Sequence, residues 1–284
     1  MFKLKIRNNN DAVLDLSQNE ENYQILKISG LTPPKAVISS SPLVNMDGEK
    51  FKNSRLDTRN IVINLKINGN IEENRLALYE FFDTGKELEI MFQNDTRNVY
   101  INGYCENIDC DLFSSRQEAQ ISIVCLNPFW KNINKETTNI SQTFDNFVFP
   151  FAIPKEGIAF SDFYVDKETE IVNKGEIEIG MIIHLTTTGE TVSNPVIYNS
   201  KTGEFLRINT TIYDYEEIII NTNKGEKSLI KISDGIMTNI INDLDLGSTW
   251  LQLRKGMNTF TYQSIENQDS LRITVEYNIE YKGV

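Results

Sequence analysis

The segment QISIVCLNPFWKN, residues 120–132, begins as a half-buried strand and ends in a proline and two large aromatic side chains. From residue 120 to residue 125, Gln, Ser and Val alternate with Ile, Ile and Cys, the pattern that places one set of side chains in a core. Pro128 ends that ladder because proline has no N–H to donate. The segment therefore closes the sheet of a first domain near the middle of the chain. Phe129 and Trp130 either seal the bottom of its core or dock against a neighbouring surface, and sealing is the simpler interpretation.

The length and composition are those of a soluble globular protein. A chain of 284 residues can form one large domain or two ordinary ones, each with its own core. Hydrophobic residues make up 40% and charged residues 24%, which is an ordinary globular balance and not a disordered one.

The chain is strongly acidic, with 40 Asp and Glu against 28 Lys and Arg and a net charge of -12. Such a charge repels phosphate backbones and anionic lipids, and no run of Lys or Arg offsets it, so we expect no nucleic-acid partner. The first ten residues, MFKLKIRNNN, lack the apolar core of a secretory signal. No apolar stretch approaches the roughly 20 residues that cross a bilayer, so we expect no membrane insertion.

Residues 1–135 predict a β-rich domain, because short segments rich in Ile, Val, Phe and Tyr alternate in polarity. One segment, 70–86, carries its large side chains on a stripe at helical spacing and has two acids in its first turn. Gly85 follows where a left-handed helix cap would lie. We expect one amphipathic helix on a sheet. The stripe consists of Ile71, Leu78, Tyr79 and Phe82, and the strands are expected at 2–7, 60–67, 87–92, 99–108 and 119–125.

Residues 136–284 predict a linker followed by a second β domain. Segment 131–146 is polar and lacks a sustained period, as linkers do. The aromatic segment 147–163 contains Pro150 and Pro154, which exclude a central strand, so we expect an extended stretch along a domain edge.

From Gly175 onward, strands return at regular intervals without helices. Turns at Thr202-Gly203 and Lys224-Gly225 join neighbouring strands. Regular strand spacing of this kind is typical of an antiparallel β-sandwich or jelly roll.

Residues that could carry metal or nucleophilic chemistry are sparse. Cys105, Cys110 and Cys125 form no CxxC pair, and we expect them to be small buried strand residues of a reduced protein. A zinc site would need a fourth ligand, and the single histidine, His184, lies far along the chain. A catalytic triad would depend on that histidine alone, and a satisfied strand histidine is the simpler reading. With no GxSxG and no phosphate-binding glycine motif, we expect no catalytic residue, no metal and no cofactor, and hence no enzyme.

Two acidic clusters are the remaining catalytic candidates. Asp243 and Asp245 would share one side of a strand, but a glycosidase pair also needs a cleft and about 5–10 Å between carboxyl groups. A calcium site needs several more converging oxygen ligands. The second cluster, Asp214, Glu216 and Glu217, could in the same way be considered as a catalytic pair or a calcium site. Solvated acidic loops are expected at both places.

Exposed aromatic residues of the second domain could instead make a sugar-binding surface. Trp250, Tyr262 and Tyr213 could stack a pyranose ring. Trp250 alternates with polar neighbours, however, as a core tryptophan would. Carbohydrate binding, with host cell-wall polysaccharide as the ligand, therefore remains the alternative to a structural role.

The order of segments along the whole chain resembles the distal tail family of phage tail proteins. Residues 56–92, LDTRNIVINLKINGNIEENRLALYEFFDTGKELEIMF, and 100–131, YINGYCENIDCDLFSSRQEAQISIVCLNPFWK, are similar to that family's N-terminal half. These segments include an Arg-containing strand, and the ending at Pro128-Phe129-Trp130 is itself a hallmark of the family. VNKGEIEIG, NPVIYNSKTGEFLRI, GSTWLQLRKGMNTFTY and VEYNIEYKGV look like its galectin-like C-terminal sandwich.

The resemblance implies a structural protein of the virion, assembled in the bacterial host cytoplasm and located at the tail tip. It implies a homo-hexameric ring that joins the tail tube protein to tip or baseplate proteins. The N-terminal domains would form the ring, and the C-terminal domains would project outward and sometimes hold a receptor-binding protein. Such a ring needs a heterologous contact that closes after a fixed rotation, and edge strands of the first domain could supply it.

Overall fold

The computed structural model describes residues 2–17, 21–44, 47–114, 116–141 and 168–284. It forms two compact units, Met1–Ile133 with Glu280–Val284, and Asn134–Ile279. The sequence placed the division between 135 and 136 and assigned all later residues to the second domain. The structure places the division two residues earlier, after Ile133, and the last five residues belong to the first unit. The expected extended stretch with Pro150 and Pro154 lies outside the described residues.

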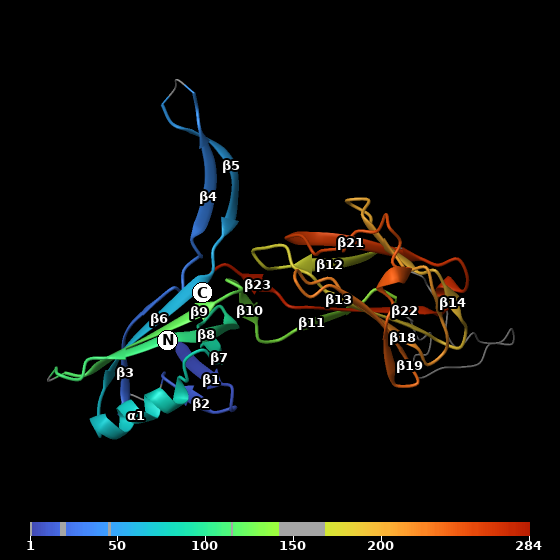
Figure 1. Cartoon of the computed structure of the whole chain (residues 1–284). Coiled ribbons are helices and arrows are strands. Elements are labelled where there is room, and N and C mark those ends of the chain that lie inside the picture. The colour runs from blue at the N-terminus through green and yellow to red at the C-terminus, as the bar shows by residue number, and fades with distance from the viewer. Residues whose placement is uncertain (1, 18–20, 45–46, 115, 142–167) are drawn as a thin grey trace. The chain divides into compact units, whose positions relative to one another are not determined.

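The first unit is built on a nine-stranded antiparallel sheet (Figure 1). Seven strands follow the order β2-β1-β7-β8-β9-β6-β3, while β10 pairs with β8 and with β23. The strands are β1 (Lys3–Asn8), β2 (Val13–Asp15), β3 (Tyr23–Ser29), β6 (Arg59–Ile67), β7 (Glu87–Gln93), β8 (Asn98–Cys110), β9 (Glu118–Cys125), β10 (Trp130–Asn132) and β23 (Glu280–Tyr281).

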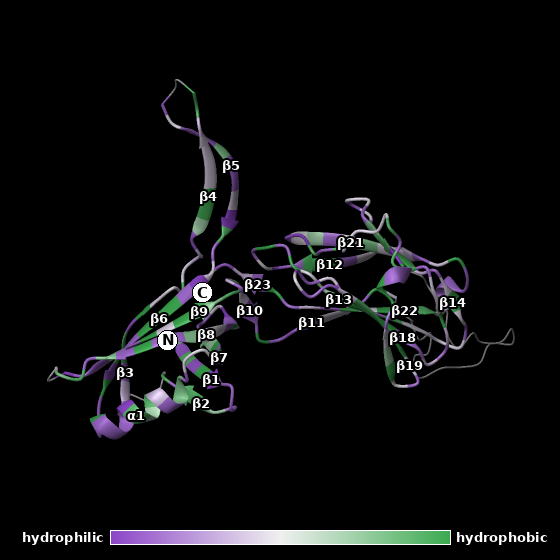
Figure 2. Cartoon of the chain, in the orientation of Figure 1, coloured by the Kyte–Doolittle hydropathy of each residue, from purple (hydrophilic) through white to green (hydrophobic). Residues whose placement is uncertain are grey.

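One face of this sheet carries the core, as the alternation of the sequence predicted. Ile61, Ile63 and Leu65 of β6 are fully buried, and β9 buries Ile121 and Ile123 beside them. Figure 2 shows hydrophobic residues recurring along these strands. Since successive side chains of a strand point to opposite faces, each strand buries every second residue and leaves a more polar set outside.

The predicted helix is α1 (Ile71–Phe81), which buries Leu78 in the core. Phe82, also fully buried, lies just past the helix and caps it with a backbone N–H to Leu78. Gly85 was expected to be the helix cap, and this is wrong. It has a φ of 82° but belongs to the following turn, in which the Lys86 N–H donates to the Asp83 carbonyl oxygen at 3.2 Å. The aromatic side chain of Phe82 stays in the core, so the helix ends before the glycine.

Pro128 does not end the sheet of the first unit, in contrast to the expectation from sequence. The chain leaves β9 after Cys125, but it returns to the sheet as β10, where Lys131 pairs with Tyr100 of β8. β10 also pairs with β23, so Trp130 lies opposite Tyr281. The second unit is thus an insertion between two paired strands. A strand of three residues, such as β10, carries too little periodicity to be predicted.

The second unit is an antiparallel β-sandwich, as predicted. A six-stranded sheet runs β11-β22-β13-β18-β19-β20 and a four-stranded sheet runs β12-β21-β15-β16. Gly203 and Gly225 have φ values of 73° and 89° and lie in the predicted turns. The strands are β11 (Glu136–Asn139), β12 (Thr169–Asn173), β13 (Ile182–Thr187), β14 (Val192–Ser193), β15 (Val196–Asn199), β16 (Phe205–Arg207), β17 (Thr211–Ile212), β18 (Glu217–Asn221), β19 (Ser228–Ser233), β20 (Ile236–Asn239), β21 (Gly256–Gln263) and β22 (Leu271–Tyr277); the 3-10 helices are Ile241–Asp243 and Gln268–Ser270.

A long hairpin projects from the first unit, and the sequence analysis missed it (Figure 1). It consists of β4 (Ala36–Pro42) and β5 (Glu49–Leu56), which form a separate two-stranded sheet. We call residues 36–56 the arm. The serine-rich β4 and the highly charged β5 lack the apolar alternation of a core strand, which is why no strand was predicted there.

Candidate functional site

Arg59, the first residue of β6, ties three other segments of the first unit to that strand through one buried guanidinium. Its side chain is buried, with only 2% of the residue exposed. Its Nε donates to the Pro128 carbonyl oxygen at 2.8 Å, and its Nη1 donates to that of Thr32 at 2.7 Å. Nη1 also donates to the Gly30 carbonyl oxygen, and Nη2 donates to that of Lys282. The planar fork of arginine suits such a set of separate acceptors.

The charge of this guanidinium is balanced by dipoles. None of the ion pairs between described residues involves Arg59, so four carbonyl oxygens take the place of a carboxylate. The guanidinium also lies over the Trp130 ring, 5.8 Å from its centroid. Burial lowers the pKa of Arg59 from its ordinary value, since removal from water disfavours the charged form. The side chain has no exposed face for a substrate, so its role is to position other segments.

The four acceptors belong to segments that lead to the projecting parts of the chain. Gly30 and Thr32 lie between β3 and the arm, and Pro128 precedes β10. Lys282 follows β23. Because β10 and β23 flank the insertion of the second unit, Arg59 fixes both of those strands and the base of the arm to one point of the sheet.

Trp130 seals the core below Arg59, which confirms the simpler interpretation for this residue but not for Phe129. Its side chain is fully buried, and its ring centroid lies 6.3 Å from that of Phe92. Phe129 is only half-buried, and its backbone N–H donates to the Asn127 side chain at 3.1 Å. Of the two aromatics, only Trp130 is a core residue.

Gly30 makes the Arg59 contact possible, because only glycine fits there. Its φ is 85°, and a Cβ at this position would overlap the backbone carbonyl of Asn60. We expect Gly30→Ala to lower the free energy of unfolding of the first unit by about 2–5 kcal/mol, from strain and overpacking. Urea unfolding followed by fluorescence in a Trp250→Phe background measures this, since Trp130 is then the only tryptophan. Gly85→Ala is the control, because Gly85 also has a positive φ of 82° but open space around it.

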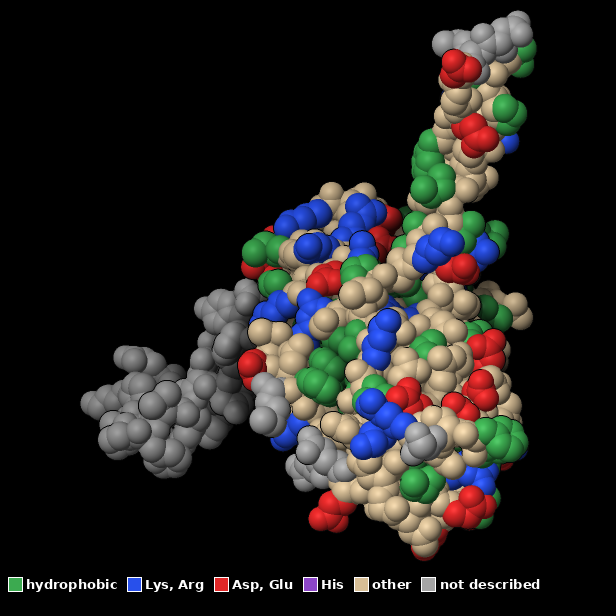
Figure 3. Space-filling view, turned by 90° about the vertical axis from the view of Figure 1, so that its left-hand side faces the viewer, with side chains coloured by type: hydrophobic (Ala, Val, Ile, Leu, Met, Phe, Trp, Pro, Cys, Tyr) green, Lys and Arg blue, Asp and Glu red, His purple; other side chains and the backbone are tan. Residues whose placement is uncertain are grey.

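The arm has one apolar and one cationic face. In its register Ala36 lies opposite Leu56 and Ser40 lies opposite Phe51, so the apolar residues of both strands share a face. On that face Ile38 is 66% exposed and Phe51 is 61% exposed. Figure 3 shows hydrophobic side chains standing free along the projection. A two-stranded hairpin alone is marginally stable in water, so the arm has the character of an element completed by a partner.

His184 lies on the outer face of β13 and is paired, as the satisfied-histidine interpretation predicted. Its Nδ1 lies 2.6 Å from Oε1 of Glu217 on the neighbouring strand β18. Ile183 and Leu185 on either side of it point into the core. No group of His, Cys, Asp and Glu side chains in the described segments has the geometry to hold a metal ion.

The first acidic cluster is not a strand pair, in contrast to the geometry considered from sequence. Asp243 ends a 3-10 helix, and the structure therefore does not place it on one side of a strand with Asp245. Asp245 lies 3.9 Å from the guanidinium of Arg207 and accepts a hydrogen bond from Gly247.

The second acidic cluster is held by a lysine. Lys231 Nζ lies 2.6 Å from the Glu216 carboxylate, and the Tyr213 N–H donates to the same side chain at 2.9 Å. Burial alone would raise the pKa of Glu216, but these hydrogen bonds outweigh it and lower the pKa. The pair is a structural contact between the β17–β18 turn, which carries Glu216, and β19, which carries Lys231.

The three aromatics considered for sugar stacking differ in exposure. Tyr262 is buried, with 5% exposed, so its ring cannot stack on a ligand. Trp250 is half-buried beneath Lys227, whose Nζ lies 5.5 Å from the ring centroid. Tyr213 is 55% exposed, and the neighbouring Tyr215, which sequence reasoning missed, is 94% exposed.

The cysteines lie in β8 and β9 and are free, with Cys105 and Cys125 buried and Cys110 partly buried. Burial raises the pKa of each thiol, that of Cys125 to about 12 despite the nearby Arg59. Because only the thiolate reacts, roughly one Cys125 in ten thousand is reactive at pH 8. We expect native protein at that pH to be alkylated by iodoacetamide at Cys110 first, and all three to react in urea. Peptide mass spectrometry measures the order, and native labelling of Cys125 as fast as Cys110 would contradict it.

Comparisons with known proteins match both units. The model of a phage tail protein RIFT-related domain matches residues 15–125, and that of the C-terminal domain of a siphovirus-type tail component matches residues 174–281. No curated protein sequence matches the chain. No helix of the described residues is long and apolar enough to span a membrane.

Solved structures of low identity share the fold over almost the whole chain. The SPP1 Dit protein, described as a paradigm of the hub adsorption apparatus of phages that infect Gram-positive bacteria, has a TM-score of 0.68 at 12% identity, covering 97% of this chain and 98% of that chain. The phage P2 baseplate in its activated conformation with Ca gives a TM-score of 0.53 at 13% identity, with 97% and 98% covered. These likenesses show that the chain shares the fold of these proteins.

Proposed function

Since the chain belongs to the phage distal tail protein family and is a structural component of the distal tail or baseplate, we propose that it forms a hexameric ring at the end of the tail. In this ring the first unit makes the subunit contacts. The ring joins the tail tube protein on one side to tip or baseplate proteins on the other. The second unit faces outward, where it can hold a receptor-binding protein.

The arm is the observation that carries this proposal. A ring needs a heterologous contact, in which one surface of a subunit meets a different surface of the next. The arm supplies the first surface, since its apolar face has no cover among the described residues of its own chain and a lone hairpin of this kind needs a partner. Arg59 supports the same role, because it ties the segment that leads into the arm to the sheet.

The mass of the full-length protein in solution tests the proposal. We expect light scattering across a concentration series to give a mass of about six subunits. Ile38→Ser with Phe51→Ser removes two exposed apolar side chains of the arm, each worth about 1.5–3 kcal/mol when buried. The pair should therefore weaken assembly by roughly 100-fold or more.

Ile236→Ser with Met237→Ser is the matched control, since these residues of β20 are 68% and 72% exposed on the second unit. Its mass should equal that of the unchanged protein. A monomer at every concentration in the unchanged protein, or full assembly of the arm variant, would contradict the proposal.

Carbohydrate binding by the second unit is the second candidate. The two exposed rings of the β17–β18 turn, Tyr213 and Tyr215, favour it because aromatic rings stack on sugar faces. Calorimetric titration of the full chain with cell-wall polysaccharide tests it, with Tyr213→Ala and Tyr215→Ala as the variant. Binding that the variant retains, or no binding at millimolar sugar, would rule out this surface.

A further inference from the structure

A groove lies beside the hairpin that joins β8 to β9 in the first unit. Its volume is about 490 Å³. Its lining combines carboxylates with apolar side chains and residues of the outer sheet face: Asn64, Asp109, Cys110, Asp111, Leu112, Phe113, Glu118, Ala119 and Gln120. Phe113 is 99% exposed and Leu112 is 47% exposed, so both stand free in the single chain.

The groove is electrically negative. Glu118 is partly neutralised by Arg116, whose Nε lies 3.3 Å from its carboxylate. No ion pair between described residues neutralises Asp109 or Asp111. Asp111 accepts a hydrogen bond from the Phe113 N–H at 3.2 Å, which shapes the hairpin. A ligand that fits this groove must bring both cations and apolar side chains.

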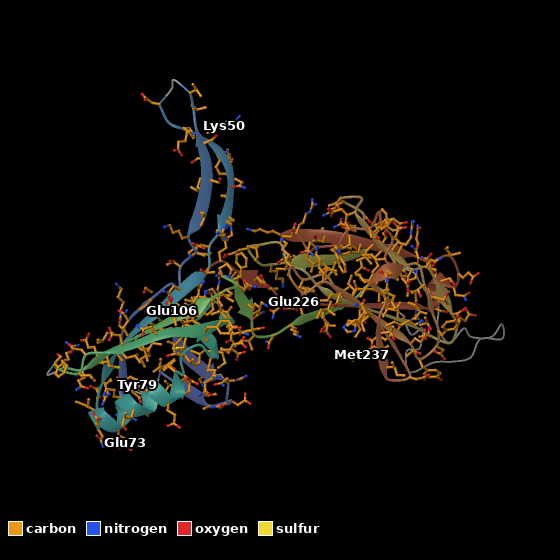
Figure 4. All side chains as sticks on the ribbon, viewed as in Figure 1. Lys50, Glu73, Tyr79, Glu106, Glu226 and Met237 are labelled. Atoms are coloured by element: carbon orange, nitrogen blue, oxygen red, sulfur yellow. The ribbon has the colours of Figure 1, made fainter. Side chains whose placement is uncertain are left out.

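The second face of the arm brings the cations. Val37 lies opposite Arg55 and Ser41 lies opposite Lys50, so both basic residues point away from the apolar face. Lys52 lies at the bulge between them and is also exposed. Figure 4 shows Lys50 on the outer part of the arm. The arm carries Lys50, Lys52 and Arg55 against Asp47 and Glu49, so its net charge is +1 in a chain with a net charge of -12.

We propose that the groove beside the β8–β9 hairpin receives the arm of the neighbouring copy of this chain. With its edge in the groove, the arm places its cationic face against Asp109 and Asp111. Its opposite, apolar face, with Ile38 and Phe51, then lies against Leu112 and Phe113. Arm and groove also lie on different sides of the first unit (Figure 1), as a head-to-tail contact requires. Complementary charge of this kind sets register and suppresses wrong partners. This inference rests on the proposed ring and names the surface that completes it.

A charge exchange tests the pairing in the full-length protein. Lys50→Asp with Lys52→Asp reverses two arm charges, and Asp109→Lys with Asp111→Lys reverses two groove charges at the same spacing. We expect each pair alone to raise the dissociation constant of the ring at least 100-fold, because like charges then face each other. Combining all four substitutions should restore assembly to within about 10-fold of the unchanged protein.

Glu80→Lys with Asp83→Lys is the matched control, because both are exposed acids of the first unit outside the groove. It should assemble normally. Full assembly of the groove variant, or loss in both pairs without restoration in the fourfold variant, would overturn the assigned groove while leaving the ring intact. If the unchanged protein is monomeric at every concentration, the proposed ring itself fails, and this inference fails with it.

Discussion

Replacing Arg59 with Met is expected to lower the free energy of unfolding of the first unit by about 3–5 kcal/mol. Methionine fills most of the volume but donates no hydrogen bond. The carbonyl oxygens of Gly30, Thr32, Pro128 and Lys282 then lose their donor together. A buried carbonyl oxygen left without a donor costs more free energy than its hydrogen bond contributed. The loss of stability should therefore exceed that of an ordinary core substitution.

The measurement is urea unfolding of the full chain in the Trp250→Phe background, where Trp130 fluorescence reports on the first unit. Arg59→Lys keeps the charge but cannot reach four separate acceptors, so it should recover only part of the loss. Arg55→Met is the control, because this exposed arginine of the arm lies outside the core. An unfolding midpoint for Arg59→Met equal to that of Arg55→Met would refute the structural role assigned to Arg59.

A readout specific to positioning accompanies the stability measurement. Hydrogen exchange should become faster at the backbone amides near Gly30 and Gly283, since both segments are tied to the sheet through Arg59. Amides of β13 in the second unit should exchange as before. A uniform increase across both units would point to general destabilisation and not to loss of this contact.

Trp130→Ala is expected to cost about 3–5 kcal/mol, the second largest effect. The side chain is fully buried between Phe92 and Arg59, and its removal leaves a cavity that β10 and β8 cannot close without losing their pairing. Part of the cost is offset, because the indole Nε1–H is buried and has no hydrogen-bond partner in the described structure. Trp130→Phe should therefore cost much less than Trp130→Ala.

Trp250 fluorescence then serves as an internal reference. Unfolding of the first unit is followed by circular dichroism, and the Trp250 transition of the second unit should keep its midpoint. Phe129→Ala is the control, since Phe129 is only half-buried, and it should cost less than half as much. Equal losses for Phe129→Ala and Trp130→Ala would contradict the assignment of the core role to Trp130 alone.

Periodicity predicted those elements that bury one face against a core. The β-sandwich of the second unit was expected from its regularly spaced strands, β6, β8 and β9 of the first unit from alternation, and α1 from its apolar stripe. Each of these has a burial pattern with the same period as its sequence, as in β6, where every second residue is buried. The turns at Gly203 and Gly225 could be predicted because both need a positive φ, which glycine adopts readily.

The candidate site was not readable in the same way. The sequence singled out Phe129, Trp130 and the Arg-containing strand. It could not identify the partners of Arg59, because these are backbone carbonyl oxygens, which every residue has. The arm was not predicted from the sequence, because a hairpin that covers no core shows no alternation of apolar and polar residues. The groove beside the β8–β9 hairpin joins Asn64 to residues 109–120 through the pairing of β6, β8 and β9.

By itself, the sequence determined the mainly β character, the single predicted helix, the sandwich and the resemblance to a tail protein family, since hydrophobic period and turn chemistry are local properties. Only the tertiary structure decided that Lys282 returns to Arg59 and that β23 belongs to the first unit. It also decided that the arm stands away from its own core. Those features depend on contacts between residues up to 223 positions apart, and such contacts produce no periodic pattern in the sequence.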